Sequence, residues 1–273
     1  QFILYGNVRD VYSLGPDRFY GLVDCLKLLI DPPEGEHQRV IVYYDLVNGV
    51  QFPNPEDEAL VESILGKEEL QRYMRESVQY PLQALIFLEE LSKLNIYAVD
   101  STKRGWGLII NHAEALIPRQ EGNYTSELEQ RKAMIFRGWF TDPAFIRGQG
   151  VIALITETLA SLNEAIANLP FATLLEVPRP DDLQRQRYLR YLKKAHSVTF
   201  ALTEKEAVFY TGGLTLQDLH QMVLQARYAK TRLTASMIFE QTQEAIEKEL
   251  SGNAEFPIIN YNFSAVVGAK KLL

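Results

Sequence analysis

Cysteine is almost absent from this chain of 273 residues, which contains Cys25 alone. A single cysteine cannot form a disulfide within the chain, and this excludes the disulfide-stabilised scaffolds of small secreted domains. Long apolar runs are also absent, since no stretch reaches the ~18–20 residues that a membrane-spanning helix requires. We therefore expect a cytoplasmic protein that does not bind a membrane, with Cys25 as a small core residue.

An excess of positive charge is lacking too. The net charge is −7 and the sequence pI is about 5.3, whereas nucleic-acid binders usually carry a basic patch or stripe. The densest basic stretch, residues 185–194, follows Asp181 and Asp182, and we interpret it as the solvated face of a helix rather than a phosphate-binding patch. The four histidines show no metal-ligand spacing (His37, His112, His196 and His220). We expect neither a nucleic-acid partner nor a metal site.

Apolar residues are plentiful, at 47% of the chain, and they support a substantial core. In the first 180 residues, short apolar runs alternate with segments of helical periodicity, a pattern that predicts βαβ units and a parallel sheet. The expected strands are residues 2–5, 40–44, 95–100, 107–111, 151–156 and 172–177. The expected helices are residues 18–30, 56–65, 79–94 and 126–140.

The pattern changes after Pro180, where helical segments follow one another without a strong strand between them. These segments are residues 181–194, 203–210, 215–229 and 234–250. We therefore predict three parts: an α/β core over 1–180, a helical domain over 181–252, and a linker over 253–273. The aromatic side chains of the linker are expected to dock against a following domain (Phe256, Tyr261 and Phe263).

Several local sequences, in the same order, resemble motifs of AAA-family ATPases. The strand ending Asn111-His112-Ala113-Glu114 resembles the second nucleotide motif, and the strand over 151–156 resembles the one that ends in a sensor residue, here Thr156 or Glu157. Residues 170–181 resemble the last core strand and its exit, and residues 266–273 resemble a linker into a further AAA core. The segment 211–219 resembles the lid signature (Gly212, Gly213 and Asp218).

This resemblance implies an AAA-like core with a parallel five-stranded sheet flanked by helices, followed by a small all-helical lid. The chain is most similar to the degenerate N-terminal AAA-like domain of a tandem bacterial AAA ATPase. On this basis the active ATP-binding domain, with its ATP and Mg, would follow this segment. The segment itself is then expected to hold no cofactor.

The largest departure from the family concerns the phosphate loop, G-x-x-x-x-G-K-[ST], whose backbone N–H groups and lysine bind phosphates. With Val40–Tyr44 taken as the first core strand, residues 45–52 contain one glycine and no lysine. Asn48 and Gly49 are then relics of the loop. In the second motif the strand ends in Asn111 and the acid, Glu114, comes three residues later, although Mg²⁺ favours a carboxylate there.

Other residues leave two interpretations open. Asp45 is interpreted as a turn-starting residue, and Glu114 as a capping or surface acid rather than a relic base. Arg137 and Arg147 are possible inter-subunit arginines, although a surface role is the simpler interpretation. Trp106 fits an exposed contact and packing at a strand edge equally well.

The sequence therefore favours a non-hydrolysing AAA-like module for assembly, regulation or partner recognition within an ATP-driven ATPase. The resemblance implies self-association into a ring, together with an unidentified protein client. One alternative is an active ATPase whose atypical phosphate loop is Asn48-Gly49. Another is a standalone protein-binding module that forms no ring.

Overall fold

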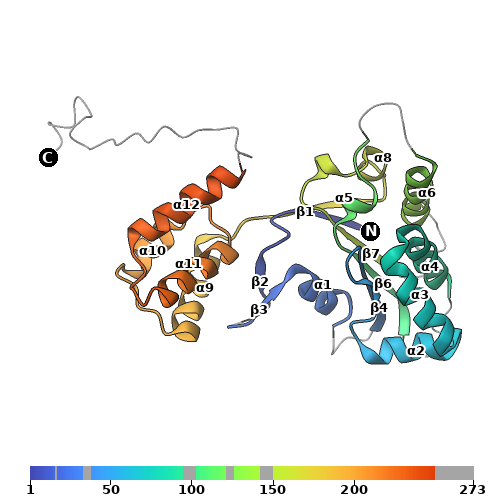
Figure 1. The fold of residues 1–273 in the computed structure, drawn as a ribbon, viewed down its shortest axis with the longest axis horizontal. Coiled ribbons are helices and arrows are strands. Elements are labelled where there is room, and N and C mark those ends of the chain that lie inside the picture. The colour runs from blue at the N-terminus through green and yellow to red at the C-terminus, as the bar shows by residue number, and fades with distance from the viewer. Residues whose placement is uncertain (16, 33–37, 95–102, 121–125, 142–149, 250–273) are drawn as a thin grey trace. The chain divides into compact units, whose positions relative to one another are not determined.

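The structure is a computed structural model that describes residues 1–15, 17–32, 38–94, 103–120, 126–141 and 150–249 (Figure 1). The chain divides into two compact units, Gln1–Arg179 and Pro180–Leu273. The predicted strand over 95–100, Arg147, and the linker over 253–273 with its aromatic side chains lie outside the described residues.

The first unit is an α/β unit built around a mostly parallel sheet. Its strands are β1 (Phe2–Gly6), β2 (Val11–Ser13), β3 (Phe19–Gly21), β4 (Gln38–Asp45), β5 (Gly49–Gln51), β6 (Lys103–Ile110), β7 (Val151–Ile155) and β8 (Thr173–Val177). Its helices are α1 (Leu22–Ile30), α2 (Pro55–Leu65), α3 (Lys67–Gln79), α4 (Pro81–Lys93), α5 (Ala113–Leu116), α6 (Glu127–Thr141) and α8 (Glu164–Ala167), with a 3₁₀ turn at Leu159–Ser161.

The main sheet has six strands in the order β5-β4-β6-β7-β1-β8. Five of these strands are parallel, as predicted, but the prediction of a five-stranded sheet needs correction, because a sixth strand, β5, pairs antiparallel with β4 at one edge. The strand β1 lies between β7 and β8, with Ile3 opposite Leu154 on one side and Leu174 on the other. A separate two-stranded sheet is formed by β2 and β3.

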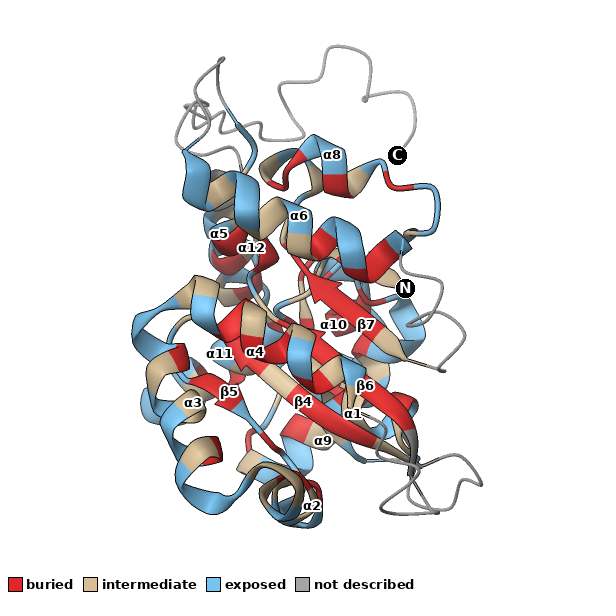
Figure 2. Cartoon of the chain, turned by 90° about the vertical axis from the view of Figure 1, so that its right-hand side faces the viewer, coloured by how far each residue is buried: buried red, intermediate tan, exposed pale blue. Residues whose placement is uncertain are grey.

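Helices cover both faces of the main sheet, which explains why its central strands consist of unbroken apolar runs. One face packs on α1, through Leu26 and Ile30, while α2, α3, α4, α6 and α8 cover the other. Figure 1 shows α1 on one side of the sheet and α3, α4 and α6 on the other, and Figure 2 shows buried residues running along β4, β6 and β7.

Two elements differ from the predicted helices. The helix expected over 18–30 begins only at Leu22, because Phe19–Gly21 forms β3 and pairs with β2. The helix α3 was not predicted, since its sequence is mostly polar and buries only Leu70 and Ser77. Ser77 lies under the β4–β5 turn, where its Oγ accepts a hydrogen bond from Val50 N–H at 2.8 Å.

The second unit contains the four predicted helices α9 (Asp182–His196), α10 (Glu204–Tyr210), α11 (Leu216–Tyr228) and α12 (Ala235–Glu249). The first three of these begin with a capping box, in which Asp181, Thr203 and Thr215 are the N-cap residues. In each box the N-cap oxygen accepts from the N3 backbone N–H, and the N3 side chain accepts from the N-cap backbone. These short-range signals explain why the helix starts agree with the prediction to within about one residue.

Candidate functional site

The crossover connections of the main sheet change sides after β1. The chain leaves β1 toward α1 on one face, whereas it leaves β4, β6 and β7 toward helices on the opposite face. In open parallel α/β sheets, ligands bind outside the carboxyl ends of the strands at such a switch point. The carboxyl ends of β1 and its neighbour β7 are therefore the place where this fold would hold a ligand.

The chain turns sharply as it leaves β1. Gly6 has φ +93°, and a Cβ there would lie 2.9 Å from Val177 O, so this exit requires glycine. The Gly6 N–H donates to Glu157 O at 3.0 Å, and the Asn7 N–H donates to Val177 O at 2.9 Å. Both backbone N–H groups are therefore already hydrogen-bonded to segments at neighbouring strand ends, and they do not form a phosphate-binding loop.

The segment after this turn is held by a buried carboxylate. Asp10 accepts hydrogen bonds from Val11 N–H and from the Asn7 side-chain amide, both at 2.9 Å. The Asn7 backbone carbonyl in turn accepts from the Tyr12 hydroxyl. The chain then forms the β2–β3 hairpin before α1 begins, and residues 6–21 contain no Gly-Lys-Ser/Thr sequence.

The sheet order corrects the placement of the phosphate loop made from the sequence. The prediction that Val40–Tyr44 is the first core strand is wrong, because β1 precedes it and lies inside the sheet. Asn48 lies in the β4–β5 turn and Gly49 begins β5 at the sheet edge, so both predicted relic residues are separated from β1 by β4, β6 and β7. The strand that precedes a phosphate loop in a strand–loop–helix unit is therefore β1.

The β4–β5 turn is closed by Asp45, as its interpretation as a turn-starting residue predicted. Asp45 Oδ1 accepts from Val47 N–H and Asn48 N–H at 2.7 Å each, and Oδ2 accepts from the Asn48 side chain at 2.9 Å. Burial by itself would raise the pKa of this carboxyl, but hydrogen bonds from Asn48, Tyr43 and Val47 outweigh it and hold the pKa below its usual range.

Two predicted site residues follow β6 and β7 and are held by neighbouring strands. The Asn111 N–H donates to Tyr44 O at 2.9 Å, and the Asn111 amide donates to the Tyr43 hydroxyl at 3.3 Å. Thr156 is buried, with its N–H donating to Leu4 O at 3.0 Å and its hydroxyl to Thr158 O at 3.1 Å. Both side chains therefore already have polar partners within the chain.

Acidic groups gather beside these strand ends. His112 Nδ1 lies 3.6 Å from Glu114 Oε1, while Glu114 Oε2 is buried and has no hydrogen-bond partner among the described residues. Glu157 joins them, because one ligand atom from each of the three residues lies within 4.8 Å of the others. Imidazole nitrogen and carboxylate oxygen are ligands of Zn²⁺, although Glu157 also forms an ion pair with Arg9.

Sequence spacing did not reveal this group, because Glu157 belongs to the segment after β7 and Arg9 to the segment after β1. His112 and Glu114 are close in sequence, but only the pairing of β6 with β7 and of β7 with β1 brings the other two residues beside them. A local sequence pattern contains no information about the order of the strands in the sheet.

Two other predicted sites lie on helices. Arg137 is an exposed residue of α6, and its inter-subunit role stays a prediction. In the lid motif, Asp218 is the acidic member of the α11 capping box and accepts from Thr215 N–H at 3.0 Å and from the Thr215 hydroxyl at 2.6 Å. Gly213 has φ +85°, the left-handed conformation that favours glycine, in the turn before this helix.

Trp106 and Cys25 are core residues. Trp106 is buried and its indole N–H donates to Leu94 O at 3.3 Å, so the structure supports packing rather than an exposed contact. Cys25 is buried, as predicted. Burial, together with Asp24, raises the pKa of its thiol, which is the opposite of what activates a nucleophile.

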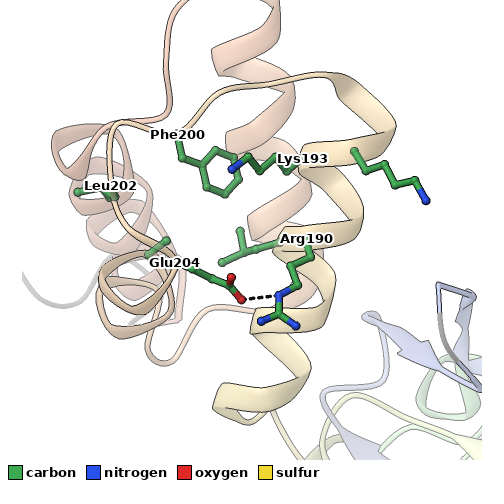
Figure 3. Close-up of a pocket in the computed structure, with 8 residues that line it drawn as sticks. Arg190, Lys193, Phe200, Leu202 and Glu204 are labelled. Atoms are coloured by element: carbon green, nitrogen blue, oxygen red, sulfur yellow. Dashed lines mark ion pairs between the residues drawn. The ribbon is translucent and has the colours of Figure 1, made fainter.

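The helical unit contains a groove between α9 and the segment that leads into α10 (Figure 3). Its volume is about 350 Å³, and eight residues line it: Leu189, Arg190, Lys193, Lys194, Phe200, Leu202, Glu204 and Ala207. The solvated helix face predicted for residues 185–194 is confirmed for Arg187, Arg190, Lys193 and Lys194, which are exposed on α9, and is wrong for Arg185. Arg185 is buried, with its guanidinium donating to Pro180 O at 2.6 Å, and the later cations of the stretch border this groove.

These features define the class of the protein: a Rossmann-like α/β unit with a switch-point edge, followed by a separate helical unit. Residues 1–178 match the family model described as "AAA+ chaperone, N-terminal Rossmann-like domain". Residues 183–251 match "AAA+ chaperone, second helical domain". Since the two models together cover most of the chain, it belongs to this AAA+ chaperone family.

Comparisons with solved structures and with curated proteins give weaker results. A chain in the solved E. coli MS115-1 HORMA:CdnC:Trip13 complex is similar to this one, with 20% identity and a TM-score of 0.43. The match covers 59% of this chain and 57% of that chain. No curated protein matches the sequence. Among the described residues, the helices are all too short or too polar to cross a bilayer.

Proposed function

We propose that this α/β unit does not hydrolyse ATP and serves as an AAA+ module for assembly, regulation or partner recognition within a larger ATP-driven ATPase. The observation that carries the proposal is the segment after β1. In a phosphate-binding loop, free backbone N–H groups and a Gly-Lys-Ser/Thr sequence receive the phosphates. Here Gly6 and Asn7 donate to strand ends instead, and residues 6–21 lack that sequence.

The charges at the switch point also support the proposal. Asp10, Glu114 and Glu157 belong to the segments that follow β1, β6 and β7, with Arg9 as the cation paired to Glu157. Polyphosphate binding relies on a lysine, a hydroxyl that positions Mg²⁺ and a metal-binding carboxylate acting together. The Thr156 hydroxyl is already bonded to Thr158 O. The residues at this edge therefore do not fit a magnesium-bound nucleotide.

An active ATPase that uses Asn48-Gly49 is the less favoured alternative. The N–H groups of Val47 and Asn48 both donate to Asp45 Oδ1, and Val50 N–H donates to Ser77 Oγ. The turn thus already encloses a carboxylate of its own. A phosphate would have to displace that buried group, at the cost of its hydrogen bonds.

The remaining parts of the proposal concern the whole assembly. ATP and Mg are assigned to a following domain, the module self-associates into a ring, and the client is a protein. Membership of the AAA+ chaperone family supports this assignment. A standalone module with no ring is the competing possibility, and concentration-dependent assembly in sedimentation velocity distinguishes the two.

Isothermal titration of the 273-residue chain with ATP and Mg²⁺ tests the central claim. Trp106 and Trp139 are both buried in the α/β unit, so their fluorescence verifies that this unit is folded in the same sample. We expect no saturable heat up to millimolar ATP. Micromolar, Mg-dependent binding would overturn the proposal, and comparison of Arg9→Ala with Asn48→Ala would then identify which loop binds the nucleotide.

A further inference from the structure

The groove of the helical unit is lined at its base by apolar side chains, and part of this apolar surface is not covered by the rest of the unit. Leu189 and Ala207 are buried, while Phe200 and Leu202 are half-buried at its wall. A volume of about 350 Å³ lies within the range of small ligand sites, roughly 300–1,000 Å³. It is large enough for one aromatic side chain of a bound segment.

The walls of the groove are held by backbone hydrogen bonds. Between α9 and α10, Ala201 N–H donates to Leu233 O at 2.9 Å, and Leu233 N–H donates to Thr199 O at 3.0 Å. The Thr203 capping box then begins α10 directly beside the groove. The groove is therefore formed before any ligand binds, which lowers the entropic cost of binding.

Positive charge borders this apolar floor. Arg190 Nε pairs with Glu204 at 2.5 Å, and Lys193 Nζ lies 5.6 Å from the Phe200 ring centroid. Figure 3 shows this ion pair and the Lys193 side chain beside Phe200. Within the described part of the chain, no carboxylate forms an ion pair with Lys193 or Lys194. The groove thus carries three cations and one carboxylate, although the chain as a whole has a net charge of −7.

Cations in the last turns of a helix are common because they interact favourably with the helix dipole. That effect explains Lys193 and Lys194 on α9, but it does not explain the partly open aromatic and aliphatic wall next to them. A wall of this kind, beside lysines with no carboxylate partner among the described residues, complements a ligand that is apolar at one point and negatively charged around it.

We propose that this groove binds an acidic peptide segment of a partner protein, which inserts one large apolar side chain over Leu189 and Ala207. Carboxylates on either side of that anchor contact Lys193 and Lys194. The inference rests on the partner-recognition part of the proposed function and names the chemistry of the partner. A nucleic acid is the less favoured ligand, because its long phosphate backbone would meet a chain with excess negative charge.

The probe is a fluorescein-labelled peptide with one central Phe flanked by Asp and Glu, added to the full 273-residue chain and followed by fluorescence polarisation. We expect saturable binding that weakens as salt increases. Replacing the central Phe by Ala should weaken binding roughly tenfold or more, since an aromatic anchor typically contributes over 1.4 kcal/mol. A peptide flanked by Lys instead of Asp and Glu should not bind.

The decisive variant is Lys194→Glu, with Lys205→Glu as its matched control. Lys205 is an exposed residue of α10 that does not line the groove, and its substitution changes the net charge equally. We expect Lys194→Glu to weaken binding roughly five- to tenfold, as the loss of one charged contact implies, and Lys205→Glu to change it less than about twofold. Far-UV circular dichroism verifies that both variants are folded.

The inference fails if the peptide shows no saturable binding up to millimolar concentration, if the two lysine variants bind alike, or if a single-stranded oligonucleotide binds more tightly than the peptide. These outcomes leave the ATP titration untouched. ATP binding by the α/β unit would overturn the proposed function while leaving a positive peptide result in place, so the two failures are distinguishable.

Discussion

Asp45 offers the sharpest test of how the α/β unit is stabilised. This residue is 5% exposed, and its side chain accepts three hydrogen bonds that close the β4–β5 turn. A hydrogen bond to a charged group contributes about 1.5–3 kcal/mol, and a set that shares one carboxylate does not add fully. We expect Asp45→Ala to lower the free energy of unfolding by about 3 kcal/mol, and Asp45→Asn by about 1.5 kcal/mol because one acceptor oxygen is kept.

Urea unfolding followed by tryptophan fluorescence measures this difference. Both tryptophans are buried in the α/β unit, so the signal reports the unit that contains Asp45 and not the helical unit. With a urea slope of about 2 kcal/mol/M, a loss of about 3 kcal/mol lowers the midpoint by roughly 1.5 M. Glu90→Gln is the control, since it removes a charge from an exposed position of α4 and should change stability by less than about 0.5 kcal/mol.

The pH dependence follows from the sign of the pKa shift. The folded-state pKa of Asp45 is lowered, so its contribution is present above the unfolded pKa of about 3.9 and is lost as the pH falls through the folded pKa. The stability gap between wild type and Asp45→Asn should be complete at neutral pH and should narrow below about pH 4. An Asp45→Asn variant as stable as wild type at neutral pH, or a gap that is unchanged in acid, would refute the reasoning.

Two further substitutions test packing and capping. A Cβ at Gly107 would lie 2.5 Å from Ile41 Cδ1 and 2.7 Å from Ile30 Cγ2, so Gly107→Ala should destabilise the α/β unit by about 1–3 kcal/mol in the same urea assay. Gly138→Ala, whose Cβ would meet nothing within 4 Å on α6, is its control and should be neutral or stabilising. Thr215→Ala removes the α11 capping box and should cost the helical unit about 1 kcal/mol. Thermal unfolding followed by circular dichroism detects this loss, and an unchanged transition would contradict it.

The comparison of sequence and structure is most instructive at the switch point. A strand over residues 2–5 was predicted, and the structure contains it as β1, yet its place between β7 and β8 was not predicted. The phosphate-loop position was therefore assigned to the wrong strand. Apolar periodicity identifies a buried strand but carries no information about its neighbours. The conclusion that a Gly-Lys-Ser/Thr sequence is missing holds at both positions, because neither residues 6–21 nor residues 45–52 contain one.

The helix α3 shows a second limit. Its hydrophilic sequence gives little apolar periodicity, and the two residues it buries are Leu70 and Ser77. The hydroxyl of Ser77 is buried because it completes the hydrogen bonding of the β4–β5 turn through Val50 N–H. Such a helix is stabilised by tertiary contacts more than by its own propensity, and a pattern of apolar residues cannot reveal it.

By itself, the sequence determined the features that depend on short-range chemistry. The capping residues Asp181, Thr203 and Thr215 begin their helices through hydrogen bonds to residues three positions ahead, and unbroken apolar runs specify strands buried on both faces. Tertiary structure alone decided which strand ends meet at the switch point, how Arg9 reaches Glu157, and how residues from α9 and the segment before α10 enclose a groove. The strand-end contacts join residues far apart in the chain, and the groove, although its lining lies within residues 189–207, depends on the backbone pairing of Thr199 and Ala201 with Leu233. The pairing of strands and packing of helices that create these contacts are properties of the whole fold.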